Sequence, residues 1–196
     1  MPNYVNSYVS FERVNKAAKE KFLLLQMRIT TENNFSDLMQ DGKITQDETH
    51  ILSWQHENVG PKWTTIDDVG DDYISMTSAW SSPDIGVQWL ISELSKVDEK
   101  MITRYSYQEE QPDFAGRYLY VGDEMYDGNE DDWEDIVDLV EMKVEGLFEL
   151  KDEDGELTEE WFDIFNENVY EVINDLDQEF FDDTLQSLYD AEKEEQ

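Results

Sequence analysis

The sequence predicts an α+β fold in which a sheet covered by helices is followed by a mostly helical and highly acidic extension. Segments with the period-two pattern of strands alternate with helix-forming segments over residues 1–125, and apolar residues recur at helical spacing over residues 126–196. The second part is also far more acidic. Residues 1–120 carry 19 acidic and 11 basic residues, whereas residues 121–196 carry 30 acidic and 3 basic residues. We therefore expect two domains, residues 1–125 and 126–196.

The first part opens with a strand and a helix. Residues 4–11 alternate so that Val5 and Val9 share one face, which is typical of a half-buried strand. Residues 14–28 are good helix formers with a leucine-rich second half, and they predict a helix. Residues 33–42 are mostly polar and predict a connection without regular structure.

Two further helix starts follow. Thr45 and Glu48 have the spacing of a capping box, which predicts a short helix through about Gln55. Ser82 and Pro83 supply a hydroxyl cap and a proline for the first helical position, which predicts a helix that runs to about Lys96. The other expected strands are residues 63–66, 73–80, 101–107 and 117–120.

The order of these elements predicts how they are arranged in space. Strand, helix, strand, strand, helix and strand in succession describe a split βαβ arrangement. The sequence therefore predicts a ferredoxin-like sandwich, in which one face of a sheet is covered by the helices that begin near Val14 and Asp84. The sheet should contain residues 4–11, 73–80 and 101–107.

Four short motifs stand in order along this first part: Asn58-Val-Gly-Pro-Lys-Trp63, Thr77-Ser-Ala-Trp-Ser-Ser-Pro83, Tyr105-Ser-Tyr-Gln-Glu-Glu110 and Phe114-Ala-Gly116. Their order and spacing resemble the Api-like family of ferredoxin-like proteins from phages and plasmids, and the opening Met-Pro-Asn before an alternating strand is similar too. The resemblance covers about residues 1–125. It implies a ferredoxin-like fold and a phage or mobile-element origin, and it implies no activity. We expect Trp63 and Trp80 to pack under the helices.

The acidic extension is too rich in aromatic residues for a solvated tail, so we expect it to fold. Residues 131–145 predict one helix with an apolar stripe, and Thr158 is a plausible cap for a long helical stretch to about Glu192. The apolar positions of that stretch change side after Phe180. We therefore expect a bend or a break near residues 177–183.

Within the long stretch, acidic residues repeat every four positions without a gap: Glu159, Asp163, Glu167, Glu171, Asp175, Glu179 and Asp183. Like charges at this spacing destabilise a helix by roughly 0.2–0.5 kcal/mol per pair, so a helix that needed only solubility would interleave lysine. The long stretch carries one acid per about 4.3 Å, and the first acidic helix one per about 3.2 Å. A DNA strand presents one phosphate per about 3.4 Å of axis.

This charge pattern predicts a basic partner. The field repels nucleic acid and anionic membranes and attracts positive surfaces, so we expect neither direct nucleic-acid binding nor membrane binding. The expected partner-binding residues are Asp131, Asp132, Glu134, Asp135, Asp138, Glu159, Asp163, Glu167, Glu171, Asp175, Glu179, Asp182 and Asp183.

The leading hypothesis is a phage-encoded DNA mimic that blocks the DNA-binding surface of a host protein, such as a nuclease, a restriction system or another defence complex. Such an inhibitor would act in the host cytoplasm, which agrees with the lack of cysteine and of a signal-peptide pattern. The alternative is an acidic adaptor or chaperone-like protein that binds a basic partner without displacing DNA. A homodimer is compatible with either hypothesis.

Calcium binding is a competing interpretation of the acids. Residues 152–158 look like the middle of an EF-hand loop, but the alignment puts Leu150 and Trp161 at its two terminal ligand positions. Residues 37–48 keep several loop positions but have Met39 at the third. A turn glycine followed by a threonine cap explains both segments more simply, so we expect no metal site.

Catalysis is not indicated either. The acids are spread over many helical turns, accompanied only by Lys143, Lys151 and Lys193, whereas a hydrolase needs a focused cluster. The two histidines, His50 and His56, are expected to have surface or structural roles. Because there is no P-loop, dinucleotide fingerprint or nucleophile motif, the sequence predicts a protein with no catalytic residue and no cofactor.

Overall fold

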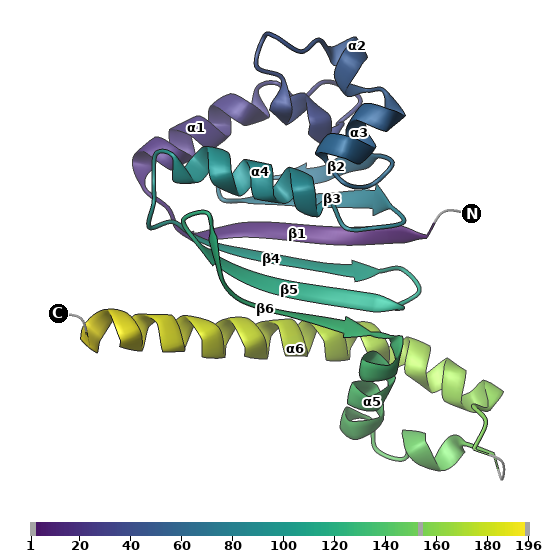
Figure 1. Ribbon diagram of the computed structural model, residues 1–196. Helices are drawn as coiled ribbons and strands as arrows, with labels where there is room; N and C mark the ends of the chain where they lie inside the picture. The colour runs from purple at the N-terminus through teal and green to yellow at the C-terminus, as the bar shows by residue number, and fades with distance from the viewer. Residues whose placement is uncertain (1–2, 153–154, 195–196) are drawn as a thin grey trace. The chain divides into compact units, whose positions relative to one another are not determined.

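A computed structural model describes residues 3–152 and 155–194. The fold is α+β, with a six-stranded antiparallel sheet, several helices and a long C-terminal helix (Figure 1). The chain forms two compact units. The sheet unit comprises residues 1–111 and 116–129, and the helical unit comprises residues 112–115 and 130–196.

The sheet has β1 near its centre, and its strands lie in the order β2-β3-β1-β4-β5-β6. Antiparallel pairing joins β1 to β3, with Val9 opposite Ile74, and joins β1 to β4, with Val9 opposite Tyr105. The strands predicted at residues 4–11, 73–80 and 101–107 are therefore confirmed as neighbours. The strand bounds are Tyr4–Arg13 for β1, Thr64–Val69 for β2, Tyr73–Ala79 for β3, Ile102–Glu109 for β4, Phe114–Val121 for β5 and Glu124–Asp132 for β6.

One face of the sheet is covered by α1 and α4, which contact each other (Figure 1). The ring of Phe11 in β1 meets Phe22 of α1 edge to face, with centroids 5.0 Å apart. The Tyr105 hydroxyl of β4 donates a 2.7 Å hydrogen bond to Asp84 at the start of α4. The predicted packing of both helices on this face is confirmed. The helical elements of the sheet unit are α1 (Lys16–Gln26), η1 (Phe35–Met39), α2 (Gln46–Thr49), α3 (Leu52–Asn58) and α4 (Asp84–Ser95).

Local capping differs from the sequence prediction at two places. The capping box of Thr45 and Glu48 is present, but the helix that it starts ends at Thr49, and a separate helix, α3, follows. The predicted hydroxyl cap of α4 is wrong, because Ser82 donates its hydroxyl to the Asp84 carboxylate and Pro83 occupies the N-cap position.

The polar connection predicted at residues 33–42 contains a 3₁₀ helix, η1. Asn34 caps this helix, and Phe35 and Leu38 are fully buried. The sequence prediction missed η1 because a five-residue helix is too short to show a hydrophobic period.

The expectation that Trp63 and Trp80 pack under the helices is wrong for both residues, and most clearly for Trp80. Its side chain is 58% exposed, and its φ of 74° lies in the left-handed region that few non-glycine residues adopt. Trp63 is half-buried and packs against Tyr4, with centroids 5.8 Å apart. Since Tyr4 alternates with the buried Val5, Trp63 contacts a side chain on the face opposite the helices.

The helical unit has its own core. It is built by α5 (Trp133–Lys143), the 3₁₀ helix η2 (Leu147–Leu150) and α6 (Glu159–Glu194). Trp161 is fully buried and stacks on Phe165, with centroids 4.7 Å apart, and its indole nitrogen donates to Glu141 at 3.0 Å. The first predicted acidic helix is thus confirmed as α5, although it begins two residues later than expected.

The second predicted helix is confirmed as α6, which is continuous from Glu159 to Glu194. Thr158 caps it as expected, since its hydroxyl accepts from the Trp161 amide at 3.2 Å. A bend or a break was expected near residues 177–183. The break is wrong, because α6 continues through these residues without interruption. A continuous helix can bury apolar residues on one side in its first half and on another side in its second half. The change of the apolar face along α6 therefore does not require a break in the helix.

Among the described residues, no helix combines the length and the apolar composition needed to cross a membrane.

Candidate functional site

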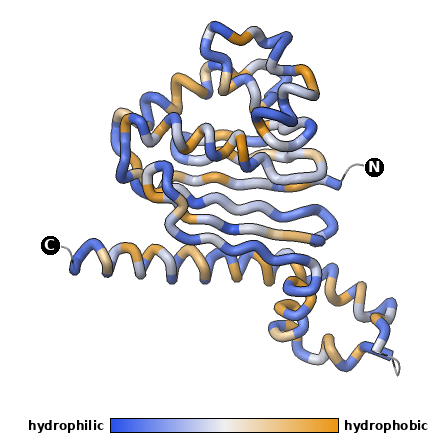
Figure 2. The backbone as a smooth tube through the Cα atoms, in the orientation of Figure 1, coloured by the Kyte–Doolittle hydropathy of each residue, from blue (hydrophilic) through white to orange (hydrophobic). Residues whose placement is uncertain are grey.

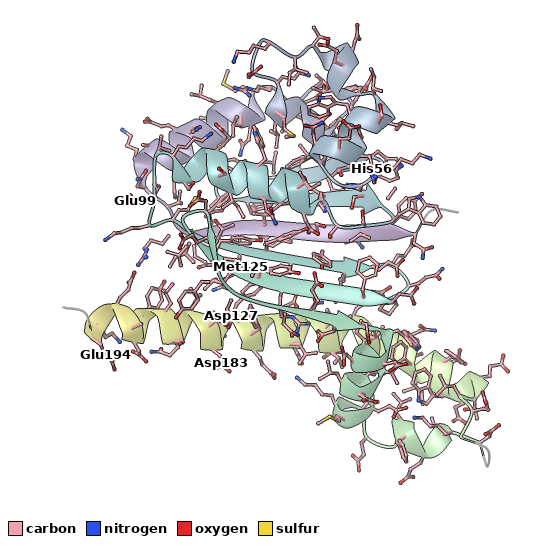
Figure 3. All side chains as sticks on the ribbon, in the orientation of Figure 1. His56, Glu99, Met125, Asp127, Asp183 and Glu194 are labelled. Carbon is pink, nitrogen blue, oxygen red and sulfur yellow. The ribbon has the colours of Figure 1, made fainter. Side chains whose placement is uncertain are left out.

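The candidate site consists of the exposed acids on α5 and α6, two helices that contact each other within the helical unit. We call the seven acids at four-residue spacing on α6 the acidic ridge. All seven are exposed: Glu159, Asp163, Glu167, Glu171, Asp175, Glu179 and Asp183. Figure 3 labels Asp183 in the C-terminal half of α6.

The ridge stays exposed because each of its acids is out of phase with the buried positions. Trp161, Phe165, Val169 and Ile173 are buried, and an acid of the ridge follows each of them by two residues. Two residues correspond to about 200° around a helix, so each acid lies on the side opposite its apolar neighbour. Figure 2 shows the resulting alternation of polar and apolar residues along α6.

Both sets also wind together around the helix. Each step of four residues advances about 40°, and both the apolar residues and the acids use this step. Phe181 is buried further along the helix, and Asp183 again follows by two residues and is exposed. The ridge is therefore a spiral of carboxylates and not a straight row.

The lysines of the helical unit are already engaged by carboxylates. Lys143 of α5 pairs with Glu179 of α6 at 3.0 Å, Lys193 pairs with Asp190 at 2.8 Å, and Lys151 lies 2.8 Å from Glu141. Of these pairs, only that of Lys143 involves the ridge. Within the described parts of the chain, Asp163, Glu167, Glu171 and Asp175 form no ion pair.

The predicted site residues at the start of α5 have two different roles: some cap the helix and others are exposed to solvent. Asp132 is the N-cap, and its carboxylate accepts from the amides of Glu134 and Asp135 at 2.9 and 3.1 Å. Asp135 completes a capping box by accepting from the Asp132 amide. Both carboxylates therefore stabilise the helix start, while the side chains of Glu134 and Asp138 are exposed.

The structure corrects the role of Asp131. It was expected on the first acidic helix, but it belongs to β6 and is only 8% exposed. Because Asp132 caps α5, the extended backbone continues through Asp131, and α5 begins only at Trp133. Asp182, the other predicted acid outside the ridge, lies on α6 and is exposed.

Sequence reasoning missed a third acidic segment, the strand β6. Its residues from Glu124 to Glu130 are exposed, and they include Asp127, which Figure 3 labels. The segment shows no hydrophobic alternation, so pattern analysis gave no strand signal. The Asp-Gly dipeptide at residues 127–128 is of a type that often forms turns, but here it lies inside the strand.

In the segment at residues 37–48, which was considered for calcium binding, two acidic side chains bind other groups of the protein. Asp37 is fully buried, accepts from the Thr30 amide at 2.9 Å and lies 2.7 Å from His50 Nε2, while Glu48 serves the capping box. Residues 153–154 of the other candidate loop lie outside the described residues. Across the residues that are described, no group of three or more side chains has the arrangement of a metal site.

The two histidines have structural partners. His50 Nδ1 lies 3.1 Å from Glu32, so both of its ring nitrogens face carboxylates. His56 Nδ1 lies 2.8 Å from the Gly60 carbonyl oxygen. Both arrangements agree with the roles that we expected for these residues.

Charge repulsion within the ridge gives a prediction for the free protein. Folding holds like charges at four-residue spacing, and mobile ions screen their repulsion. We expect the melting temperature at neutral pH to rise between low and moderate sodium chloride concentrations. A melting temperature that stays constant or falls in a calorimetric salt series would contradict this expectation.

Comparisons with protein-family models, with curated proteins and with solved structures found no match for this chain.

Proposed function

We propose that this protein is a DNA mimic that occupies the DNA-binding surface of a basic protein and thereby excludes DNA from it. The observation that supports this function best is the acidic ridge of α6, whose seven acids remain exposed over six successive steps. Four of them, Asp163, Glu167, Glu171 and Asp175, have no cationic partner within the described residues. Their charge is therefore available to a partner.

The geometry of the ridge supports a comparison with a DNA strand. Four residues of a right-handed α-helix advance about 40° and rise about 6 Å. B-DNA has 10–10.5 base pairs per turn, so its phosphates advance about 35° in the same hand. The angular step is similar, while the rise per charge of about 3.4 Å in a DNA strand is smaller. The acids of α5 add to the density of charge beside the ridge.

Carboxylates can take the place of phosphates for a basic groove. Arginine forms bidentate hydrogen bonds with both groups, and lysine interacts with both as a point charge. A groove that grips DNA through many such side chains would meet carboxylates of Glu167, Glu171 and their neighbours instead. Long-range attraction between the opposite charges would also speed association.

The sheet unit is part of the same proposal. Its strand order β2-β3-β1-β4, with α1 after β1 and α4 between β3 and β4, supports a ferredoxin-like sandwich with β5 and β6 as additional strands. We propose that this ferredoxin-like part is the scaffold of a phage-encoded inhibitor that acts on a nuclease, restriction system or other defence complex in the host cytoplasm. The resemblance to the Api-like family stays a prediction.

Capture from a bacterial lysate tests the proposed function. The immobilised full-length protein should retain a basic DNA-binding protein, and excess duplex DNA of random sequence should release it. Release by DNA but not by an equal concentration of a short neutral polymer supports competition for one surface.

The acidic adaptor hypothesis predicts a different result. In that case the captured protein would stay on the immobilised chain when duplex DNA is added, and DNA would be retained together with it. Retention of DNA would therefore overturn the mimic and favour the adaptor.

A further inference from the structure

The face of the sheet opposite α1 and α4 is open at β1 and carries tyrosines. The side chains of Tyr4 and Tyr8 are 37% and 45% exposed, whereas the alternating residues Val5 and Val9 are fully buried under the helices. Tyr8 stacks on Tyr73 of β3, with ring centroids 5.7 Å apart and an interplanar angle of 24°. The open face therefore presents a stacked aromatic pair.

A β-bulge brings two consecutive aspartates to this same face. The pairing of β2 with β3 shifts register between Ile66 and Asp68. As a result, Asp67 accepts a 2.7 Å hydrogen bond from Thr77 and Asp68 accepts a 2.6 Å hydrogen bond from Tyr73. Thr77 and Tyr73 lie four residues apart on β3 and share a face, so both carboxylates lie on that face. Bulges redirect side chains in this way next to binding sites.

The ring of Tyr73 is held in place. Its edge packs against Gly70, where an added Cβ would come within 2.2 Å of the ring, and its hydroxyl is bonded to Asp68. Any larger residue at position 70 would displace the ring. The tyrosine pair thus offers a preorganised platform, while Tyr8 keeps much of its surface open to solvent.

The charges around this platform are mostly negative. Burial raises the pKa of Tyr8, and the negative charges of Asp72, Glu12 and Asp68 raise it further. A positive group on this face is Arg104, whose Nε lies 2.9 Å from Glu12. The site therefore has an excess of negative charge.

We propose that Tyr8, Tyr73, Asp67 and Asp68, here called the tyrosine–aspartate face, bind an arginine-bearing segment of a protein partner. A guanidinium group stacks on an aromatic ring and at the same time donates hydrogen bonds to carboxylates, and this face places both kinds of group together. The negative charge selects a cation, and the exposed strand surface suits an extended segment. This inference does not depend on DNA mimicry, because it concerns residues of the sheet unit.

The chemistry favours arginine over lysine. The Tyr8 ring offers a flat surface that matches a planar guanidinium, and Asp67 and Asp68 offer carboxylate oxygens as acceptors. An ammonium group is more strongly hydrated and cannot stack in this way. We therefore expect an arginine peptide to bind more tightly than the corresponding lysine peptide.

Nuclear magnetic resonance of the full-length protein with labelled tyrosine rings tests the proposal. The probe is a short peptide of alternating glycine and arginine at physiological salt, with citrulline and lysine versions for comparison. We expect saturable shifts of the Tyr8 and Tyr73 ring signals with the arginine peptide, smaller shifts with lysine and none with citrulline. Equal binding of the lysine peptide would overturn the assignment to arginine.

Matched variants separate this site from the general attraction of an acidic protein for cations. Tyr8→Thr should weaken binding, read at Tyr73, by about two- to fivefold, the effect of losing an exposed cation–π contact. Tyr4→Thr removes a tyrosine from the same face of the same strand and should leave binding unchanged. Likewise, Asp68→Asn should weaken binding more than Asp47→Asn, which removes one charge elsewhere in the sheet unit. Equal effects within either pair would overturn the proposal.

Discussion

Replacing Asp163, Glu167, Glu171 and Asp175 together with Asn or Gln should weaken binding to the captured partner by roughly fourfold to a thousandfold at low salt. Each lost contact with a basic side chain contributes about 0.2–1 kcal/mol, and four act together. The salt dependence of binding should also become shallower, because fewer ions are exchanged when the complex forms. Titrations of parent and variant at several salt concentrations measure both effects.

A matched control removes four charges from the sheet unit instead. Asp47, Glu57, Glu99 and Asp123 are exposed there, and their replacement with Asn or Gln changes the net charge equally. This control should retain most of the affinity if the ridge is the contact surface. An equal loss in both variants would show that net charge, and not the ridge, determines binding. The ridge variant should remain folded, since it relieves like-charge repulsion.

Trp161→Ala should destabilise the helical unit by about 3–5 kcal/mol, the usual cost of truncating a fully buried tryptophan. The substitution removes the stacking partner of Phe165 and leaves Glu141 without its indole donor. Hydrogen exchange should show loss of protection in α5 and in the first half of α6. The amides of β1 and β4 should keep their protection, because these strands belong to the other compact unit.

Glu141→Gln is the control for the contribution of packing. Glutamine keeps an oxygen that can accept from Trp161, although it loses the ion pair with Lys151. Its effect should be clearly smaller than that of Trp161→Ala. If the two substitutions destabilise the protein equally, the polar contacts and not the aromatic stack hold this core together.

Elements with a strong hydrophobic period could be predicted from the sequence. The alternation around Val5 and Val9 predicted β1, and apolar residues at helical spacing predicted α5 and α6. These patterns are direct consequences of burying one face of an element. The strand β6 could not be predicted in this way, because its acidic residues are exposed and its place depends on pairing with a neighbouring strand.

Competing hydrogen bonds account for other differences. Ser82 has the right spacing for a helix cap, but its hydroxyl donates to Asp84, whose other oxygen accepts from Tyr105. That interaction links residues distant in sequence, which local rules do not include. The expected break in α6 failed for a different reason. The sequence shows that the apolar face rotates, but it does not show that both stripes can be buried along one continuous helix.

The acidic ridge itself follows from the sequence, because its four-residue spacing places most of its acids two residues after an apolar position. Which acids are available to a partner does not follow. Asp131 is buried, Asp132 caps a helix, and Glu179 pairs with Lys143 across two helices. The tyrosine–aspartate face could not be predicted from the sequence either. The β-bulge that brings Asp67 and Asp68 to the same face depends on the register between β2 and β3.

Competition between this protein and duplex DNA for one purified partner tests the central claim most directly. The partner is titrated with labelled DNA in the presence of increasing parent protein, at several salt concentrations. The account predicts that the two bind exclusively, so that the apparent affinity for DNA falls in proportion to the added protein and the ridge variant competes poorly. A ternary complex of partner, DNA and parent protein would contradict it.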